Sequence, residues 1–432
     1  MRTDAARTQR SAEAFARALR LMPGGVNSPV RAMRAIGRDP LFVARGDGPE
    51  LVDVDGNRYV DWVMSWGPLA AGHARPEVVA AVTAAAAAGT SYGAPTEAES
   101  DLAAEVVERM PAVSMVRMTS SGTEASMSAI RLARAATGRD AVVKFAGAYH
   151  GHVDGLLAEA GSGLATQGIP ASPGVTAAQA ADTVVVRWND RAAVERALSE
   201  RDVAALLCEP YPANMGLVAP EPGFLSFLRE AADAAGALLV FDEVISGFRV
   251  ARGGAAELER AAPDLVVLGK IIGGGLPAAA YAGRRDLMEL VAPAGQVYQA
   301  GTLSGNPLAT AAGLATLRLL DDAAYAHLAA IAATLGEGLA AAAAAAGVPV
   351  QVARTTGLLT LFFSESPVRD YDGAAACDLA AHAMFCRAML ARGVYLPPSQ
   401  FEAWFPSLAH GDDEVERTLA AAREALAEVA AL

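Results

Sequence analysis

The 432-residue chain contains little cysteine and lacks the features of a secreted protein. Its three cysteines, Cys208, Cys377 and Cys386, form no C-x-x-C pair, which argues against a disulfide framework and against a cysteine zinc site. The first twenty residues mix charges of both signs and contain no apolar core of the kind found in signal peptides. These absences predict a cytoplasmic protein with reduced thiols.

Long hydrophobic runs and an excess of basic charge are also missing. The longest apolar tract, residues 340–346 with its flanks, is expected to be too short and too weakly hydrophobic to span a bilayer. Acidic residues outnumber basic ones by 48 to 35, which gives a net charge of −13 and disfavours binding to phosphate backbones or anionic membranes. With 53% hydrophobic residues, the chain is predicted to be globular and to bind neither nucleic acid nor membrane.

The middle of the chain alternates short apolar runs with longer helical patterns. The helical patterns include residues 124–136 and 224–235, and a mostly parallel sheet is the arrangement that such alternation predicts. The apolar runs are residues 115–118, 141–145, 183–187, 204–208, 237–241 and 265–268.

The two ends of the chain have a different pattern. Residues 41–65 read as short strands with a hairpin turn at Asp55-Gly56-Asn57, and strand-like pieces at 348–353 and 357–363 accompany long alanine-rich helices. We therefore expect an α/β protein whose mostly parallel central sheet lies in a large domain, with a small α+β domain built from both termini. The expected division is 1–65 joining the small domain, 66–315 as the large domain, and 316–432 as the C-terminal α+β domain.

Two carboxylates stand at the end of one apolar run. Residues 237–241 are followed by Asp242 and Glu243, and the carboxyl ends of strands are where open α/β sheets bind ligands. A helix cap accounts for Glu243 equally well. Asp242 would be nearly buried, so it needs a cationic partner, and a protonated pyridine nitrogen would serve.

A lysine ends another apolar run. The segment 263–270 closes with Lys270 and is followed by three glycines at 273–275. A lone lysine is usually a surface charge, but in an apolar loop desolvation lowers the amine's pKa and makes it nucleophilic. A phosphate-binding P-loop is disfavoured because Asp264 and Ile271 stand where that motif requires glycine and a hydroxyl residue.

Two further clusters follow strand-like runs. Ser121, Gly122 and Thr123 precede a helical pattern, where they form either an ordinary N-cap or an anion site built from free N–H groups. Tyr149 could stack on a flat cofactor, and the nearby His150 and His152 could only bind a metal if a further ligand came from elsewhere. A phosphate cradle, a stacking ring, an acid and a lysine are together what a pyridoxal-phosphate site requires.

On these residues the chain resembles the class III aminotransferases of pyridoxal-phosphate fold type I, over nearly its whole length. The segments 22–32 and 393–405 narrow the resemblance to the aminomutases of that family. The other segments that carry it are SSGTEASMSAIRLARAATGRD at 120–140, YHGHVDGLL at 149–157, FDEVISGFRV at 241–250, LGKIIGGGLP at 268–277 and VYQAGTLSGNP at 297–307.

The resemblance implies an isomerase of tetrapyrrole (porphyrin) biosynthesis. It would move an amino group within one molecule, converting glutamate-1-semialdehyde to 5-aminolevulinate through 4,5-diaminovalerate, with pyridoxal 5'-phosphate and pyridoxamine 5'-phosphate as cofactor forms. A transaminase with separate donor and acceptor, or a cofactor-binding protein without catalysis, remain alternatives. Intact Lys270 and Asp242 count against the last of these.

The resemblance also implies residue roles. Lys270 would hold the cofactor and move a proton, Asp242 would pair with the ring nitrogen, and Tyr149 would stack on the ring. The phosphate would be held by Ser121, Gly122 and Thr123, with Thr302 supplied by the other subunit of a homodimer. The implied substrate contacts are Ser28, Arg31, Trp66, Asn214, Tyr298 and Glu402.

Two further features come from the same resemblance. Arg31 suits the substrate carboxylate, which a guanidinium binds through two hydrogen bonds. Residues 155–175, rich in small residues, would form a gating loop that retains the intermediate, with a surface loop as the plain alternative. No metal is expected, and transient contact with an upstream reductase is a hypothesis only.

Overall fold

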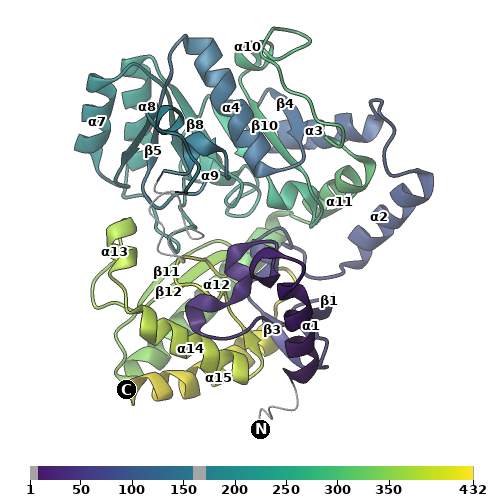
Figure 1. Cartoon of the computed structure of the whole chain (residues 1–432), viewed down its shortest axis with the longest axis vertical. Helices are drawn as coiled ribbons and strands as arrows, with labels where there is room; N and C mark the ends of the chain where they lie inside the picture. The colour runs from purple at the N-terminus through teal and green to yellow at the C-terminus, as the bar shows by residue number, and fades with distance from the viewer. Residues whose placement is uncertain (1–7, 159–171, 432) are drawn as a thin grey trace.

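A seven-stranded sheet forms the upper half of the molecule in a computed structural model that describes residues 8–158 and 172–431 (Figure 1). The strand order is β4-β10-β9-β8-β7-β5-β6, and every neighbouring pair is parallel except the two that involve β10. The strands are β4 (Met115–Thr119), β5 (Ala141–Phe145), β6 (Thr183–Val186), β7 (Val203–Cys208), β8 (Leu238–Asp242), β9 (Leu265–Leu268) and β10 (Ala279–Gly283).

The six apolar runs all form strands within a residue or two of the predicted bounds, so the mostly parallel central sheet is confirmed. The strand that sequence reasoning missed is β10. Its sequence, Ala-Ala-Tyr-Ala-Gly, contains none of the β-branched residues that indicate a strand. It is fully buried between β4 and β9, where small side chains leave room for the helices above.

Helices cover both faces of this sheet. Alternate residues of the strands point to opposite faces: Val240 packs with α4 (Gly122–Thr137), whereas Leu239 packs with α8 (Phe224–Ala235). Neighbouring helices complete the layers (Figure 1). They are α3 (Glu97–Arg109), α6 (Ala177–Ala180), α7 (Arg191–Glu200), α9 (Gly254–Leu258), α10 (Arg285–Met288) and α11 (Pro307–Arg318), with the 3₁₀ turns η6 (Asp154–Leu156) and η7 (Lys270–Gly273). Helix α2 (Pro76–Ala88) lies beside α11 at the edge of the molecule, away from the sheet (Figure 1).

The lower half combines the two ends of the chain. Its four-stranded sheet has the order β1-β2-β3-β13, and the C-terminal β13 pairs in parallel with the N-terminal β3. The predicted turn at Asp55-Gly56-Asn57 joins β2 to β3, and the Asp53 side chain accepts hydrogen bonds from the backbone of Asp55 and Asn57. The strands are β1 (Val43–Asp47), β2 (Glu50–Asp53), β3 (Arg58–Asp61), β11 (Gln351–Thr355), β12 (Leu358–Phe362) and β13 (Val394–Tyr395).

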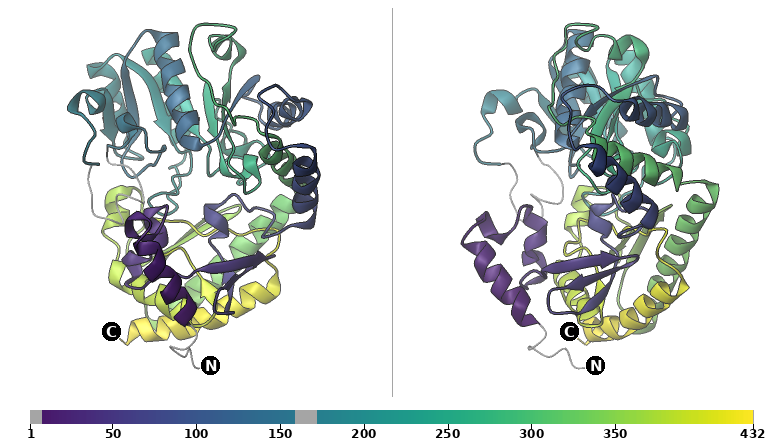
Figure 2. Two further views of the ribbon diagram at one scale, coloured as in Figure 1. Left: turned by 45° about the vertical axis from the view of Figure 1, so that its right-hand side comes forward. Right: turned by 90° about the vertical axis from the view of Figure 1, so that its right-hand side faces the viewer.

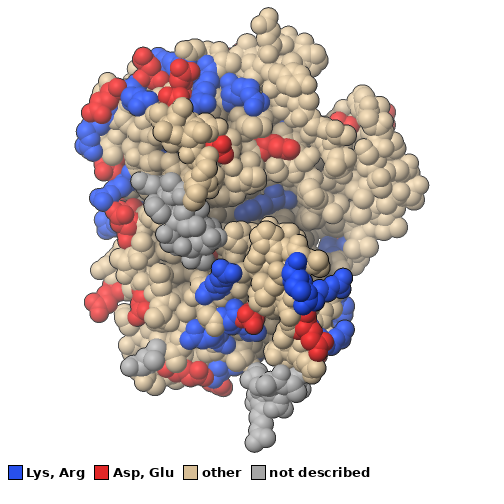
Figure 3. All heavy atoms as spheres, viewed as in Figure 1, with Lys and Arg blue, Asp and Glu red and all other residues tan. Residues whose placement is uncertain are grey.

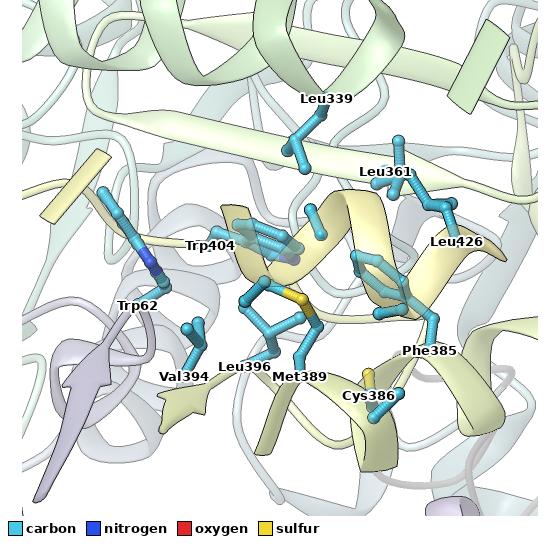
Figure 4. Packing of buried hydrophobic residues seen from close by; sticks show 14 of the residues in the cluster. Trp62, Leu339, Leu361, Phe385, Cys386, Met389, Val394, Leu396, Trp404 and Leu426 are labelled. Atoms are coloured by element: carbon cyan, nitrogen blue, oxygen red, sulfur yellow. The ribbon is translucent and has the colours of Figure 1, made fainter. Parts of the chain in front are cut away.

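A single apolar core holds this half together. Trp62 from the N-terminal part lies beside Leu396 and Trp404 from the C-terminal part (Figure 4), and both described ends of the chain lie at the bottom of the molecule (Figure 2). The helices here are α1 (Gln9–Leu19), α12 (Asp322–Ala346), α13 (Tyr371–Ala375), α14 (Leu379–Ala391) and α15 (Asp412–Ala430), with the 3₁₀ turns η2 (Pro23–Gly25), η3 (Pro29–Ala32), η4 (Arg34–Ile36) and η5 (Met64–Trp66).

One helix of this half, α12, corrects an expectation. The apolar tract at 340–346 belongs to a 25-residue helix that is long and apolar enough to cross a membrane, and it is the one such helix within residues 8–158 and 172–431. The expectation that the tract and its flanks are too short and too weakly hydrophobic to span a bilayer was therefore wrong. Ile331, Leu335 and Leu339 are nevertheless buried in the same core as Leu361 of β12 and Leu426 of α15, which is the packing of a core helix.

His410 in this core generates a pH prediction. Its ring stacks on Trp62 at 4.0 Å, its Nδ1 accepts a hydrogen bond from the Ser407 backbone, and burial lowers its pKa to about 3. The unfolded chain binds a proton at this histidine near pH 6.5, so stability is lost as the pH falls from about 6.5 towards 3. Between about pH 7.5 and 4.5 the free energy of unfolding of the wild type should fall by about 2–3 kcal/mol more than that of His410→Gln does.

Denaturant unfolding at the two pH values measures this difference. The exposed His152 offers a matched control, and His152→Gln should keep the acid sensitivity of the wild type. Equal acid sensitivity of His410→Gln and the wild type would contradict the assignment of a neutral buried His410.

Candidate active site

Lys270 stands where β9 ends and η7 begins. Its φ is +50°, a left-handed conformation that non-glycine residues rarely adopt and that is often found at functional sites. Burial lowers the pKa of the Lys270 amine, while the carboxylates of Glu402, Glu209 and Asp242 oppose that effect. A partly desolvated amine of this kind is suited to attack an aldehyde.

The chain has only one other lysine, Lys144. It is fully buried, and its ammonium donates to the backbone carbonyls of Ala148, Leu156 and Ala158 at 3.3, 3.2 and 2.7 Å. A lysine with its donors used in this way is a structural group, which leaves Lys270 as the lysine candidate for a reactive amine.

Asp242 is the last residue of β8 and is almost completely buried. One carboxylate oxygen accepts a hydrogen bond from the Val244 N–H at 3.0 Å, and the other lies 2.7 Å from Nδ1 of His150. The other ring nitrogen of His150, Nε2, is buried without a hydrogen-bond partner among the described residues. His150 thus orients the Asp242 carboxylate, a role that sequence reasoning missed when it weighed His150 as a metal ligand.

The N-terminus of α4 shows both features that its sequence allowed. Ser121 is the N-cap: its hydroxyl accepts from the Glu124 N–H, and the Glu124 side chain accepts from the Ser121 N–H in return. The N–H groups of Gly122 and Thr123, in the first helical turn, have no intrahelical acceptor and suit an anion. At Gly122 an added Cβ would lie only 3.3 Å from Val244, so glycine keeps this approach open.

A cavity of about 210 Å³ brings these groups together. Of the site residues predicted from the sequence, it collects Gly122, Thr123, Tyr149, Asn214, Asp242 and Lys270. A buried acid and an amine therefore line one cavity that also has a helix N-terminus at its edge. The remaining lining residues are Ser126, His150, Gly151, Glu209, Val244 and Ile245.

These residues fit a phosphorylated pyridine aldehyde. Buried Asp242 requires a cation, and the ring nitrogen would provide it. Tyr149 has an accessible ring, 38% exposed, and Ser126 presents a buried hydroxyl without a hydrogen-bond partner among the described residues. A larger cavity of about 680 Å³, beside α4 and η6, is lined by neither Lys270 nor Asp242.

Seven predicted residues lie outside the lining of the smaller cavity, namely Ser28 and six others. Of these six, Glu402 is buried, and its charge acts on both Lys270 and Tyr149. Ser121 caps α4. The other four are Arg31, Trp66, Tyr298 and Thr302, of which Tyr298 is 72% exposed and Arg31 and Thr302 are also exposed.

Ser28 also lies outside this lining, as the residue before η3. The predicted gating loop, residues 155–175, falls largely on 159–171, outside the described residues. Its described flanks, including Gly155 and Leu156, line the larger cavity beside α4. The loop therefore stays a prediction.

Glu209 is a site residue that sequence reasoning missed. It is fully buried directly after β7; its carboxylate accepts from the Tyr149 and Ala213 N–H groups at 2.8 and 3.1 Å and from the Asn214 amide at 3.0 Å. Burial raises its pKa. The signal was available, because Glu209 follows the apolar run 204–208 just as Asp242 follows its own run.

The whole chain is similar to known proteins. The family described as "Aminotransferase class-III" matches residues 33–426. The glutamate-1-semialdehyde 2,1-aminomutase of Roseiflexus castenholzii is 59% identical over 97% of this chain and 98% of its own length. That of Thermomicrobium roseum is 56% identical, with 96% and 97% covered.

Solved structures agree with this relationship. An omega-transaminase from Sphaerobacter thermophilus superposes with a TM-score of 0.90 at 34% identity, covering 99% of this chain and 98% of its own. A glutamate-1-semialdehyde aminomutase variant from Pseudomonas aeruginosa, in complex with PMP, superposes with a TM-score of 0.87 at 30% identity, covering 98% and 96%. The chain belongs to the class III aminotransferase family of enzymes that use a pyridoxal-phosphate type of cofactor, and within it to the glutamate-1-semialdehyde 2,1-aminomutase group.

Proposed function

We propose that this protein is an isomerase that converts glutamate-1-semialdehyde to 5-aminolevulinate by intramolecular amino transfer through 4,5-diaminovalerate, a step of tetrapyrrole biosynthesis. The observation that carries the proposal is the cavity that joins Lys270 to Asp242 in a chain 59% identical, end to end, to an aminomutase. The cofactor would alternate between its pyridoxal 5'-phosphate and pyridoxamine 5'-phosphate forms and supply an electron sink when bound.

The chain's own residues then have distinct tasks. Lys270 holds the cofactor through its amine and carries the proton between cofactor and substrate carbon. Asp242, oriented by His150, stabilises a positive charge on the ring nitrogen. The N–H groups of Gly122 and Thr123 bind the phosphate.

Tyr149 and Asn214 have linked roles. Tyr149 stacks on the cofactor ring, and Asn214 contacts the substrate. The Glu209 carboxylate accepts hydrogen bonds from both residues, from the Tyr149 N–H and from the Asn214 side-chain amide. It therefore links the positions of these two residues.

The substrate would bind between the two halves. Basic side chains lie in the hollow between them on the face seen in Figure 3, and a carboxylate substrate is attracted to such a site. We assign substrate contacts to Ser28, Arg31 and Trp66 from the N-terminal part and to Glu402 from the C-terminal part, with Tyr298. We also propose the domain division expected from the sequence: residues 1–65 joining the small domain, 66–315 as the large domain and 316–432 as the C-terminal α+β domain.

A homodimer completes this proposal. Helix α2 has no buried residue although its composition is strongly apolar, and Tyr298 and Leu303 are 72% and 54% exposed. Exposed apolar surface of this extent indicates a protein interface. A second copy of this chain would cover it and bring Thr302 to the partner's phosphate. A cytoplasmic location, with the three cysteines buried and unpaired, and transient contact with an upstream reductase belong to the same proposal.

A transaminase with separate donor and acceptor is the second candidate function. The similarity to an omega-transaminase at a TM-score of 0.90 favours it, because the fold and the lysine–aspartate pair serve both reactions. What distinguishes the two reactions is whether an external amino donor is consumed.

The reaction itself provides the first test. Purified protein reconstituted with pyridoxamine phosphate should convert glutamate-1-semialdehyde to 5-aminolevulinate with no amino donor present, and Lys270→Ala should lower the rate by at least about 10²-fold, the scale of a lost proton-transfer group. Product that appears only after an amino donor is added would favour the transaminase. No product under either condition would refute both.

The lysine content of the chain allows a second test. Reduction with borohydride after incubation with pyridoxal phosphate should fix the label on the peptide that contains Lys270, as read by mass spectrometry. Lys144→Met is the matched control, because it removes the only other lysine and should leave the label in place. A label on Lys144, or one that persists at the same level in Lys270→Ala, would contradict the assignment.

A further inference from the structure

Arg249 is a buried cation that the proposed reaction does not use. It is 1% exposed and lies in the turn, residues 244–250, that follows β8. Its guanidinium donates to the carbonyls of Gly357 and Pro406 at 3.2 and 3.1 Å and to that of Gly67. Among the described residues it forms no ion pair with an acid at up to 4.0 Å. A charge buried at this cost requires its hydrogen bonds.

The groups around Arg249 converge on Lys270. The Arg249 guanidinium carbon lies 5.2 Å from the centre of the Phe405 ring, and Nζ of Lys270 lies 6.0 Å from the same centre. A Cβ added at Gly67 would lie 2.9 Å from the Phe405 ring and 3.6 Å from Cδ of Lys270. Gly67, Phe405 and Lys270 therefore lie close together, and Arg249 hydrogen-bonds to the first and lies over the ring of the second.

Arg249 also bonds to the end of a strained turn. Met64, Ser65, Trp66 and Gly67 have φ values of +43°, +57°, +70° and +112°. Left-handed conformations of non-glycine residues are unfavourable and persist only where the surroundings fix them. The hydrogen bond from Arg249 to the Gly67 carbonyl fixes the end of this turn.

We propose that Arg249 is a positioning residue for Lys270: it holds the Gly67 turn and the Phe405 ring as one wall of the lysine's pocket and keeps a permanent positive charge behind that wall. The inference rests on the proposed role of Lys270 as the cofactor lysine. Arg249 then affects the protonation of the Lys270 nitrogen as well as the stability of the fold.

The charges around Lys270 determine the expected direction. Glu402, Glu209 and Asp242 all favour a proton on the lysine nitrogen, and Arg249 is the cation among the described residues that opposes it. Replacing Arg249 by a neutral side chain leaves the carboxylates without that opposition. The nitrogen should then hold its proton to higher pH.

The experiment is a pH titration of the absorbance of holoenzyme with pyridoxal phosphate bound. The midpoint is the pH at which half of the Lys270 nitrogens have lost their proton. In Arg249→Met it should rise by about half a pH unit, the scale of the effect of one partly screened charge nearby. Arg249→Lys keeps the charge and should return the midpoint of this titration to the wild-type value. Its thermal stability should stay low, because the compact ammonium of a lysine does not have the spread of the planar guanidinium that reaches the carbonyls of Gly67, Gly357 and Pro406.

Arg109 provides a matched control. It is also buried and donates to two backbone carbonyls, those of Leu317 and Leu320, at 2.7 and 3.0 Å, but it lies outside the lysine's pocket. Arg109→Met should lose thermal stability and leave the midpoint unchanged. A folded Arg249→Met with the midpoint of Arg109→Met would overturn the proposal.

Phe405→Leu keeps the proposal testable if Arg249→Met does not fold. It removes the ring and leaves Arg249 bound to its carbonyls, so the midpoint should fall, because an aromatic face stabilises a nearby cation. An unchanged midpoint there would overturn the proposal as well. A wild-type protein with no lysine-linked cofactor band would instead refute the proposed function, so the two failures are distinguishable.

Discussion

The cost of burying charge determines the arrangement of the site. Asp242, Glu209 and Arg249 are each at most 4% exposed, and a lone buried ion is unfavourable by several kcal/mol. Each is therefore bound by specific groups: His150 and a backbone N–H for Asp242, two N–H groups and an amide for Glu209, and three carbonyls for Arg249. Because these partners are fixed, the cavity beside Lys270 is already shaped before any ligand enters it.

Much of this site could be predicted from strand ends alone. Asp242 and Lys270 follow apolar runs, and the carboxyl ends of parallel strands meet at one edge of a sheet, so their proximity follows from the pattern. Glu209 obeys the same rule but was overlooked, because the resemblance implied a role for Asn214, five residues later, and none for Glu209. His150 could not be assigned, since a histidine beside another histidine gives no indication of which carboxylate it will meet.

Other features depend on contacts between distant segments and leave no local signal. Nothing near Arg249 in the sequence indicates that its guanidinium will bind carbonyls at Gly67, Gly357 and Pro406. The strand β10 was missed for a related reason: its alanines are selected by the helices that cover it and not by strand propensity. Helix α12 is ambiguous from its sequence, because its composition fits both a core helix and a membrane span. Only its packing against β12 and α15 identifies it as a core helix.

The positions of these residues indicate which part of the site determines whether the reaction is that of an aminomutase or that of a transaminase. The sheet edge with Lys270 and Asp242 belongs to a fold that superposes on both kinds of enzyme, at TM-scores of 0.90 and 0.87, so that edge alone cannot select the reaction. The other wall of the lysine's pocket, Gly67 and Phe405, comes from the segments that connect to the lower half. An intramolecular transfer requires that the diamine stay bound between its two steps, and this second wall supplies groups for retaining it that the sheet edge does not. Reaction specificity should therefore depend on how firmly that wall is held against Lys270.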